Sequence, residues 1–292
     1  MPKKFKNLFL NIGAMKAGTT WLYAMMNTHP DVFFSQRKEI PYFAAGLYPK
    51  QISRRNRFIQ FKRFMGYMKT DTFPPNVEEM VKWYSYYLSE PVDDAWYRQL
   101  FAANPGKKYC ADFSNLNASL GKTEWQHVKA MTKNLKVVYI MRHPLKRLWS
   151  HYKFDHEHAQ KVLETENLSA REVNRKVRTK AIWGSTAYSD VTRSLQDNLN
   201  PNQYMIAFFE DIHQNPLGWL AQLEEFLQIR PHQYEAELVT NKVNSSESIE
   251  MPDYFPDLFA DDLKAEMDKL EDQGLALPDS WKDIRGYRGQ SG

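Results

Sequence analysis

The stretch LFLNIGAMKAGTTWLY, residues 8–23, runs an apolar strand directly into a glycine-bounded loop and then into a helix-like segment. Backbone N–H groups at such a helix start point toward an anion, so this unit is a natural phosphate cradle. Gly13 and Gly18 have the spacing of the GxxxxGK[ST] loop of nucleoside-triphosphate-binding proteins. However, Thr19 stands in the place of that loop's lysine, and Lys16 lies three residues earlier. The pattern predicts a site that binds a terminal phosphate or sulfate. This site lacks the lysine that contacts the γ-phosphate in nucleoside-triphosphate-binding loops.

A second apolar run, LKVVYIM at residues 135–141, has the β-branched composition of a buried strand. Arg142 follows it at once, and a helix is predicted to start at Pro144, because proline is favoured in the first helical turn. Arg142 would therefore lie at the carboxyl end of its strand, where open α/β sheets bind ligands. Ser150, two turns into the helix, is expected to project toward the same anion.

Together, these two motifs resemble those of the sulfotransferases that use 3′-phosphoadenosine 5′-phosphosulfate (PAPS). The first cofactor loop of that family has the form PKxGTTW or GxxKxGT, which is matched by Lys16, Gly18, Thr19, Thr20 and Trp21. The 3′-phosphate signature of the family is R[DN]PxxRxxSxY, which is matched by Arg142, Pro144, Arg147, Ser150 and Tyr152. His143 departs from that signature, so its role stays open.

The resemblance implies a role for each matched segment. In the family, the first loop holds the 5′-phosphosulfate, and its lysine touches the bridging oxygen that becomes the leaving group. In the small-molecule branch of the family, the tryptophan stacks on adenine. A further stretch, residues 184–199, resembles the family's GxYxxxLxxW segment and places a tyrosine near the cofactor. The implied cofactor-binding residues are Lys16, Ala17, Gly18, Thr19, Thr20, Trp21, Arg142, Ser150 and Tyr188.

Glu39 is the candidate general base. It lies before Tyr42 and Phe43 and resembles the glutamate of an ExxFF or EIxFF context that takes the acceptor's proton in glycosaminoglycan-type sulfotransferases. Sulfuryl transfer needs a base for that proton and a cation for the charge that grows on the leaving oxygen, and Glu39 and Lys16 are the candidates. Because sulfate carries less charge than a γ-phosphate, we expect no metal, and no aspartate motif for magnesium is evident.

Two further segments resemble parts of the family without settling their roles. Residues 108–119 resemble the GExSPxY segment, with Asp112 and Ser114 at its acid and hydroxyl positions, whereas Phe113 and Asn115 depart from the lysine and proline often seen there. Acceptor contacts at this point therefore stay open. Residues 241–248 lie where relatives close a loop over the 3′-phosphate, and their candidate residues are Lys242, Asn244 and Ser245.

The order of segments predicts an α/β fold, a single domain over residues 1–292 with a central, mainly parallel sheet flanked by helices. A chain of this length can bury a large core. The expected elements are strands at 7–12, 31–34, 135–141 and 203–209 and a helix at 19–28. A substrate-side insertion is expected at about 44–104. In it, residues 57–68 predict an amphipathic helix that packs on the core, lines an acceptor cleft or lies on a membrane surface.

The charge distribution and the cysteine content indicate which ligands the protein binds and in which compartment it works. Residues 1–70 hold 13 Lys and Arg against 2 Asp and Glu, whereas residues 245–292 hold 5 against 12, and a basic N-terminal half suits an anionic cofactor. Cys110 is the only cysteine, and neither a signal-peptide pattern nor an 18-residue apolar run occurs. We expect a cytoplasmic enzyme that acts on a small-molecule or glycan acceptor and binds no nucleic acid. The acceptor's identity and the oligomeric state stay open.

Two other function classes remain. A P-loop kinase would share the cradle, but it should carry a lysine at position 19 and a metal-binding aspartate after a strand. A non-catalytic adaptor for lipid or nucleic acid would use the basic and aromatic segment 54–69, but it would not need Glu39, Arg142 and Ser150 in this order.

A cluster of histidines and one aspartate follows Ser150. It lacks the HExxH pattern of a metal-binding helix and is expected to be a solvated helix surface. Its members are His151, Asp155, His156 and His158.

Overall fold

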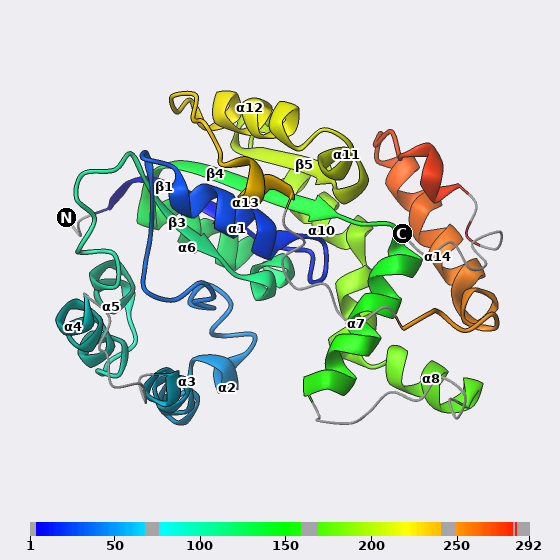
Figure 1. Cartoon of the computed structure of the whole chain (residues 1–292), viewed down its shortest axis with the longest axis horizontal. Coiled ribbons are helices and arrows are strands. Elements are labelled where there is room, and N and C mark those ends of the chain that lie inside the picture. Colours follow the sequence, from blue (N-terminus) through cyan, green and yellow to red (C-terminus); the bar gives the residue numbers. More distant parts are fainter. Residues whose placement is uncertain (1–3, 68–75, 159–168, 241–248, 283, 285–292) are drawn as a thin grey trace. The chain divides into compact units, whose positions relative to one another are not determined.

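The computed structural model describes residues 4–67, 76–158, 169–240, 249–282 and 284. Its described strands form a parallel sheet in the order β2-β3-β1-β4-β5, flanked by helices (Figure 1). The strands are β1 Phe5–Asn11, β2 Val32–Phe34, β3 Tyr109–Phe113, β4 Thr132–Met141 and β5 Tyr204–Phe208. This confirms the predicted α/β class.

The helices fall close to the expected positions where the sequence carries a strong start signal. α1 occupies the predicted residues, and α7 begins at the predicted proline. The helices are α1 Thr19–Thr28, α2 Pro49–Ile52, α3 Arg54–Tyr67, α4 Val77–Tyr87, α5 Asp94–Gln99, α6 Lys122–Met131, α7 Pro144–His158, α8 Ala170–Val177, α9 Lys180–Trp183, α10 Tyr188–Asn198, α11 Phe209–Gln214, α12 Pro216–Leu227, α13 Ala236–Thr240 and α14 Phe255–Asp272. Short 3₁₀ turns include Asn115–Ser119 and Asp279–Trp281. No helix in the described part of the chain combines the length and apolar character needed to cross a membrane.

By its internal contacts the chain divides into two compact units. The first comprises Met1–Ile12 and Met26–Val137, and the second comprises Gly13–Met25 and Val138–Gly292. The first cofactor loop thus belongs with the C-terminal half of the sequence. Glu39 belongs to the first unit.

In the first unit, β3 pairs with both β1 and β2, with Leu8 opposite Cys110 and Val32 opposite Tyr109. Nearly all of β1 is buried, as expected for a strand covered on both faces. Strand β4 begins three residues earlier than the apolar run predicts. Its polar start is paired, because Asn134 donates to the side chain of Asn7.

The insertion of the first unit consists of α2 to α5 (Figure 1). The predicted amphipathic helix is α3, and it packs on α4, where the rings of Phe61 and Phe64 lie 5.2 and 4.5 Å from that of Tyr84. Arg57 of α3 is fully buried and donates hydrogen bonds to the carbonyl oxygens of Tyr87 and Ser89. It thereby satisfies the backbone at the end of α4.

In the second unit, β4 leads into α7, which packs against α8, α9 and α14 (Figure 1). Helix α10 also packs on α14. Strand β5 leads directly into the short helix α11. The ends of β4 and β5 are therefore followed at once by the residues from which the candidate site is built.

Candidate active site

The first cofactor loop has a backbone that few side chains tolerate. Gly13 and Gly18 have φ angles of 121° and 83°, and Lys16 has a φ of 68°, which is costly for a residue with a Cβ. A Cβ built at Gly18 would lie 2.9 Å from Cδ2 of Phe209, so glycine is also required for space. The loop is thus a strained, closely packed turn that ends at Thr19, the first residue of α1.

Backbone hydrogen bonds tie this loop to the end of β4. The N–H of Ala14 donates to the carbonyl of Ile140 at 2.7 Å, and the N–H of Ile140 donates to the carbonyl of Gly13 at 2.8 Å. The loop consequently lies beside the point where β4 gives way to Arg142. The N–H groups at the start of α1 add the positive end of a helix to this place.

Arg142 joins the two motifs directly. Its Nη1 donates to the carbonyl oxygen of Lys16 at 3.1 Å, and its guanidinium lies 4.8 Å from the ring centroid of Phe209. The ammonium of Lys16 lies 4.4 Å from the ring centroid of Phe154 on α7. Two cations are thereby held by aromatic rings beside the loop, an arrangement suited to a ligand with more than one anionic group.

The other predicted cofactor residues differ in exposure. Ala17 and Thr19 are buried, whereas Thr20, Trp21 and Ser150 are partly exposed. The indole N–H of Trp21 donates to the carbonyl of Val239 at 3.1 Å, which restrains the position of its ring.

Tyr188 acts on the backbone of Arg142. It is fully buried, and its hydroxyl donates to the carbonyl oxygen of Arg142 at 2.8 Å. Burial raises the pKa of Tyr188 to about 12, so the hydroxyl keeps its proton at neutral pH. The sequence placed this tyrosine near the cofactor; the structure gives it a contact with the residue that follows β4.

His143, whose role the sequence left open, is fully buried, and its backbone makes a hydrogen bond to the segment after β5. Its N–H donates to Oε1 of Glu210 at 2.9 Å. Burial, with smaller contributions from Lys146 and Arg142, lowers the pKa of His143 to about 4. The imidazole is therefore neutral at pH 7.

In the first unit, Glu39 is exposed, and its Oε1 accepts a hydrogen bond from the side-chain amide of Asn115 at 3.1 Å. Its carbonyl oxygen accepts a bond from Nε of Arg37 at 3.0 Å. Asn115 is one of the two positions that depart from the family's segment, and it contacts the candidate base. The carboxylate of Glu39 is both held and open to solvent.

Asp112, the other carboxyl of this region, is buried. Its Oδ2 accepts a hydrogen bond from the hydroxyl of Tyr97 at 2.8 Å, and its Oδ1 accepts one from the N–H of Ile40 at 3.4 Å. Burial raises the pKa of Asp112 to about 8, although the bond from Tyr97 opposes this shift. Asp112 thus anchors the backbone next to Glu39.

The structure adds four residues that contact the candidate residues or their neighbours and that the sequence did not single out: Phe154, Phe209, Glu210 and Trp281. Phe209 and Glu210 follow β5 as Arg142 follows β4, so their position at a strand's carboxyl end was a usable signal. Trp281 carried no such signal. The candidate residues Lys242, Asn244 and Ser245 lie outside the described residues.

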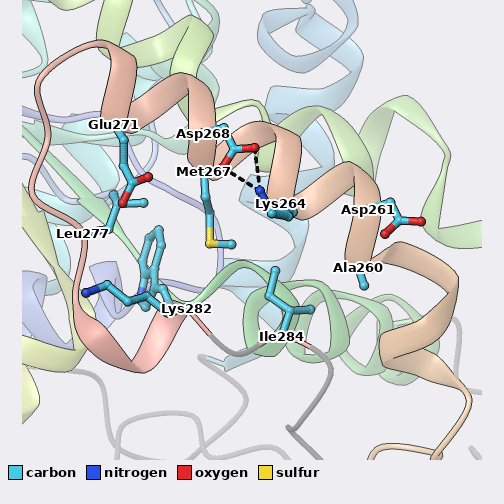
Figure 2. Close-up of a pocket in the computed structure, with 10 residues that line it drawn as sticks. Ala260, Asp261, Lys264, Met267, Asp268, Glu271, Leu277, Lys282 and Ile284 are labelled. Atoms are coloured by element: carbon cyan, nitrogen blue, oxygen red, sulfur yellow. Dashed lines mark hydrogen bonds and ion pairs between the residues drawn. The ribbon is translucent and has the colours of Figure 1, made fainter.

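The second unit also contains a pocket of about 550 Å³ (Figure 2). It is less suited to an anionic nucleotide than the region around the first cofactor loop and Arg142. Its lysines are already paired, Lys264 with Asp268 at 3.0 Å and Lys282 with Asp279 at 2.5 Å. Asp261 and Glu271 also line it. The surplus of carboxylates there would repel phosphate.

The cluster that the sequence suggested as a solvated helix surface is only partly so. His151 is buried, and its Nδ1 lies 3.1 Å from Nη1 of Arg147, while Asp155 pairs with Lys176. Burial, then the charge of Arg147, lowers the pKa of His151 to about 3, so its Nδ1 is a neutral acceptor. Within the described ranges, no group of His, Cys, Asp and Glu side chains is placed to hold a metal ion.

The fold is similar to those of solved sulfotransferases. A sulfotransferase from Alicyclobacillus acidocaldarius is 17% identical, with a TM-score of 0.64 over 95% of this chain and 99% of the other. The sulfotransferase domain of the Synechococcus PCC 7002 olefin synthase is 14% identical, with a TM-score of 0.57 over 95% and 98%. That of the curacin biosynthetic pathway is 17% identical, with a TM-score of 0.52 over 81% and 77%. No curated protein sequence matches this chain.

The family model described as a sulfotransferase domain matches residues 8–254. This range contains the first cofactor loop, Glu39, Arg142 and Ser150, and it leaves out Trp281. The match favours sulfuryl transfer over the kinase and the adaptor hypotheses. The chain belongs to the sulfotransferase domain family.

Proposed function

We propose that this protein transfers a sulfuryl group from PAPS to a hydroxyl or amine of an acceptor, with a sugar or an aliphatic alcohol as the favoured class, and releases 3′-phosphoadenosine 5′-phosphate (PAP). The observation that carries the proposal is the contact of the Arg142 guanidinium with the carbonyl of Lys16. It brings together two cation-bearing segments, and PAPS carries anionic groups at both its 5′ and its 3′ positions.

The residues present fit such a nucleotide. The strained loop around Gly18 and the start of α1 offer backbone donors to the 5′-phosphosulfate, with Lys16 as its cation. Arg142, with Ser150 on α7, would bind the 3′-phosphate through charge-assisted hydrogen bonds. Trp21, whose ring is partly exposed and held by Val239, would stack on the adenine.

Glu39 and Lys16 divide the proposed chemistry. PAPS supplies the sulfuryl group, whose sulfur loses its bond to the bridging phosphate oxygen as the acceptor atom bonds to it. Glu39 takes the proton of the acceptor, and Lys16 stabilises the negative charge that grows on the bridging oxygen. Support for Glu39 comes from its exposed carboxylate, which Asn115 holds.

No metal takes part in this scheme, because Lys16 and the backbone donors would neutralise the leaving phosphate. We therefore expect turnover to persist in excess chelator. Loss of activity on chelation that magnesium restores would contradict the scheme.

The deciding experiment measures nucleotide affinity by calorimetry. PAP should bind at least tenfold more tightly than adenosine 5′-phosphate (AMP), because only PAP offers a 3′-phosphate to Arg142. Arg142→Ala should weaken PAP binding by about 1.5–3 kcal/mol, the scale of hydrogen bonds to a charged group, and weaken AMP binding less, through the lost bond to the carbonyl of Lys16. Equal affinity of the wild type for both nucleotides would refute the assignment. Acceptor pools incubated with labelled PAPS, with the product read by mass, would then identify the acceptor.

A further inference from the structure

The peptide unit that joins Arg142 to His143 is held at both of its polar atoms. Its carbonyl oxygen accepts the hydrogen bond from the hydroxyl of Tyr188 at 2.8 Å, and its N–H donates to Oε1 of Glu210 at 2.9 Å. A peptide unit is planar, so two such bonds fix its orientation. The direction in which the Arg142 side chain leaves the backbone therefore depends on both bonds.

Glu210 is itself oriented by Trp281. The indole N–H of Trp281 donates to Oε2 of Glu210 at 3.1 Å, so each carboxylate oxygen serves a different donor. Trp281 is fully buried, and its ring centroid lies 6.0 Å from that of Tyr188 and 5.2 Å from that of Phe208. The turn Asp279–Trp281 thus contacts both residues that hold the peptide unit.

Two adjacent residues of α11 contact Arg142 and the peptide unit that follows it. Phe209 lies under the Arg142 guanidinium, and Glu210 receives the N–H of His143. The end of β5 therefore supports both the side chain and the backbone of the residue that follows β4. Trp281 extends this support to a turn beyond residue 254, where the family match ends.

We propose that Glu210 and Trp281 are positioning residues that aim Arg142 at the 3′-phosphate of the nucleotide. This inference rests on the proposed function and adds to it a part of the chain that the family match leaves out. A carboxylate near a phosphate site weakens anion binding by repulsion. If Glu210 were only a nearby charge, its removal would tighten PAP binding; as a positioning residue, its removal weakens it.

The test is a double-mutant cycle on PAP and AMP affinity. In Glu210→Gln, one oxygen is replaced by an NH₂ group that faces an N–H donor. The peptide unit that directs Arg142 then loses one of its two bonds, and PAP affinity should fall about tenfold. Trp281→Phe keeps an aromatic ring and removes the indole donor, and PAP affinity should fall about threefold. In the Trp281→Phe background, Glu210→Gln should cost about threefold or less, because the glutamine oxygen can still serve His143. AMP affinity should stay within about twofold throughout.

Asp211→Asn is the matched control, since it removes a neighbouring exposed carboxylate from α11 and should leave both affinities unchanged. Unchanged or tighter PAP binding in Glu210→Gln, or an equal cost in both backgrounds, would overturn the inference. A parallel loss of PAP and AMP affinity with a lower unfolding temperature would also overturn it, since that is the result of a structural role alone. Should Glu210→Gln not fold, Trp281→Phe alone must show the selective loss of PAP affinity. If the wild type itself does not prefer PAP to AMP, it is the proposed function that fails.

Discussion

At the scale of single residues, the carboxyl groups of Glu39 and Asp112 have opposite environments. Glu39 is exposed and hydrogen-bonded to Asn115, whereas Asp112 is buried, with its pKa raised to about 8. Pairs of acids whose surroundings differ in this way usually have different roles. In the proposed scheme Glu39 takes the proton, whereas Asp112 anchors the neighbouring backbone through its bond from Ile40.

Glu39→Gln keeps the shape of the side chain and removes its capacity to take a proton. We expect kcat to fall by ~10²–10⁴, while PAP affinity stays within a few-fold of the wild-type value. Glu79→Gln, on the exposed surface of α4, is the control and should leave both quantities unchanged. A Glu39→Gln variant with near wild-type turnover would require another base.

Asp112→Asn should change how stability depends on pH. In the folded protein the pKa of Asp112 rises from 3.8 to about 8, so between these values the folded state binds more protons than the unfolded state. This carboxyl therefore makes the free energy of unfolding fall as pH rises through that window. Denaturant unfolding at pH 5 and pH 8 should show a smaller loss for Asp112→Asn than for the wild type. The exposed Asp190→Asn is the control, and an equal loss in Asp112→Asn and wild type would contradict the prediction.

At the scale of elements, the first cofactor loop depends on close packing between its backbone and α11. Gly18→Ala would place a Cβ 2.9 Å from the ring of Phe209 at a φ of 83°. We expect a loss of about 1–3 kcal/mol in the free energy of unfolding together with weaker PAP binding. Gly46→Ala is the control, because a Cβ there meets nothing within 4 Å. Unchanged stability and PAP affinity in Gly18→Ala would contradict this account of the loop.

The elements also show what the sequence could predict. Helix α1 and the start of α7 follow from local signals, the glycine-bounded loop and Pro144, which act on neighbouring residues. The contacts of Phe209 with Gly18 and of Trp281 with Glu210 join residues far apart in the chain. Their formation depends on how β5 and the last turn pack, and no local pattern encodes that packing. The Asn115 contact with Glu39 was hidden in the same way, at a position that departs from the family's motif.

At the scale of the whole molecule, the cofactor residues proposed here all lie in the second unit, whereas Glu39 lies in the first. PAP should therefore slow amide hydrogen exchange first in residues 13–25, 142–150 and 204–214. At a PAP concentration of 100 Kd the stabilisation is about 2.7 kcal/mol. Locally exchanging amides of α3 and α4 should respond little, and AMP should protect residues 142–150 less than PAP does. Protection confined to the first unit would contradict the assignment of the nucleotide site.

The membership of Gly13–Met25 in the second unit also bears on how the protein is made. Within this unit the loop is synthesised first, and Trp21 bonds to the backbone of Val239, 218 residues later. At a synthesis rate of about 5–20 residues per second, this partner arrives roughly 10–40 s after the loop, and Trp281 arrives later still. In the proposed scheme, PAPS therefore has no complete site until Val239 and Trp281 have been synthesised. A translation product that stops before Trp281 would contain both phosphate motifs but lack the bond from Trp281 to Glu210, and we expect it to bind PAPS weakly.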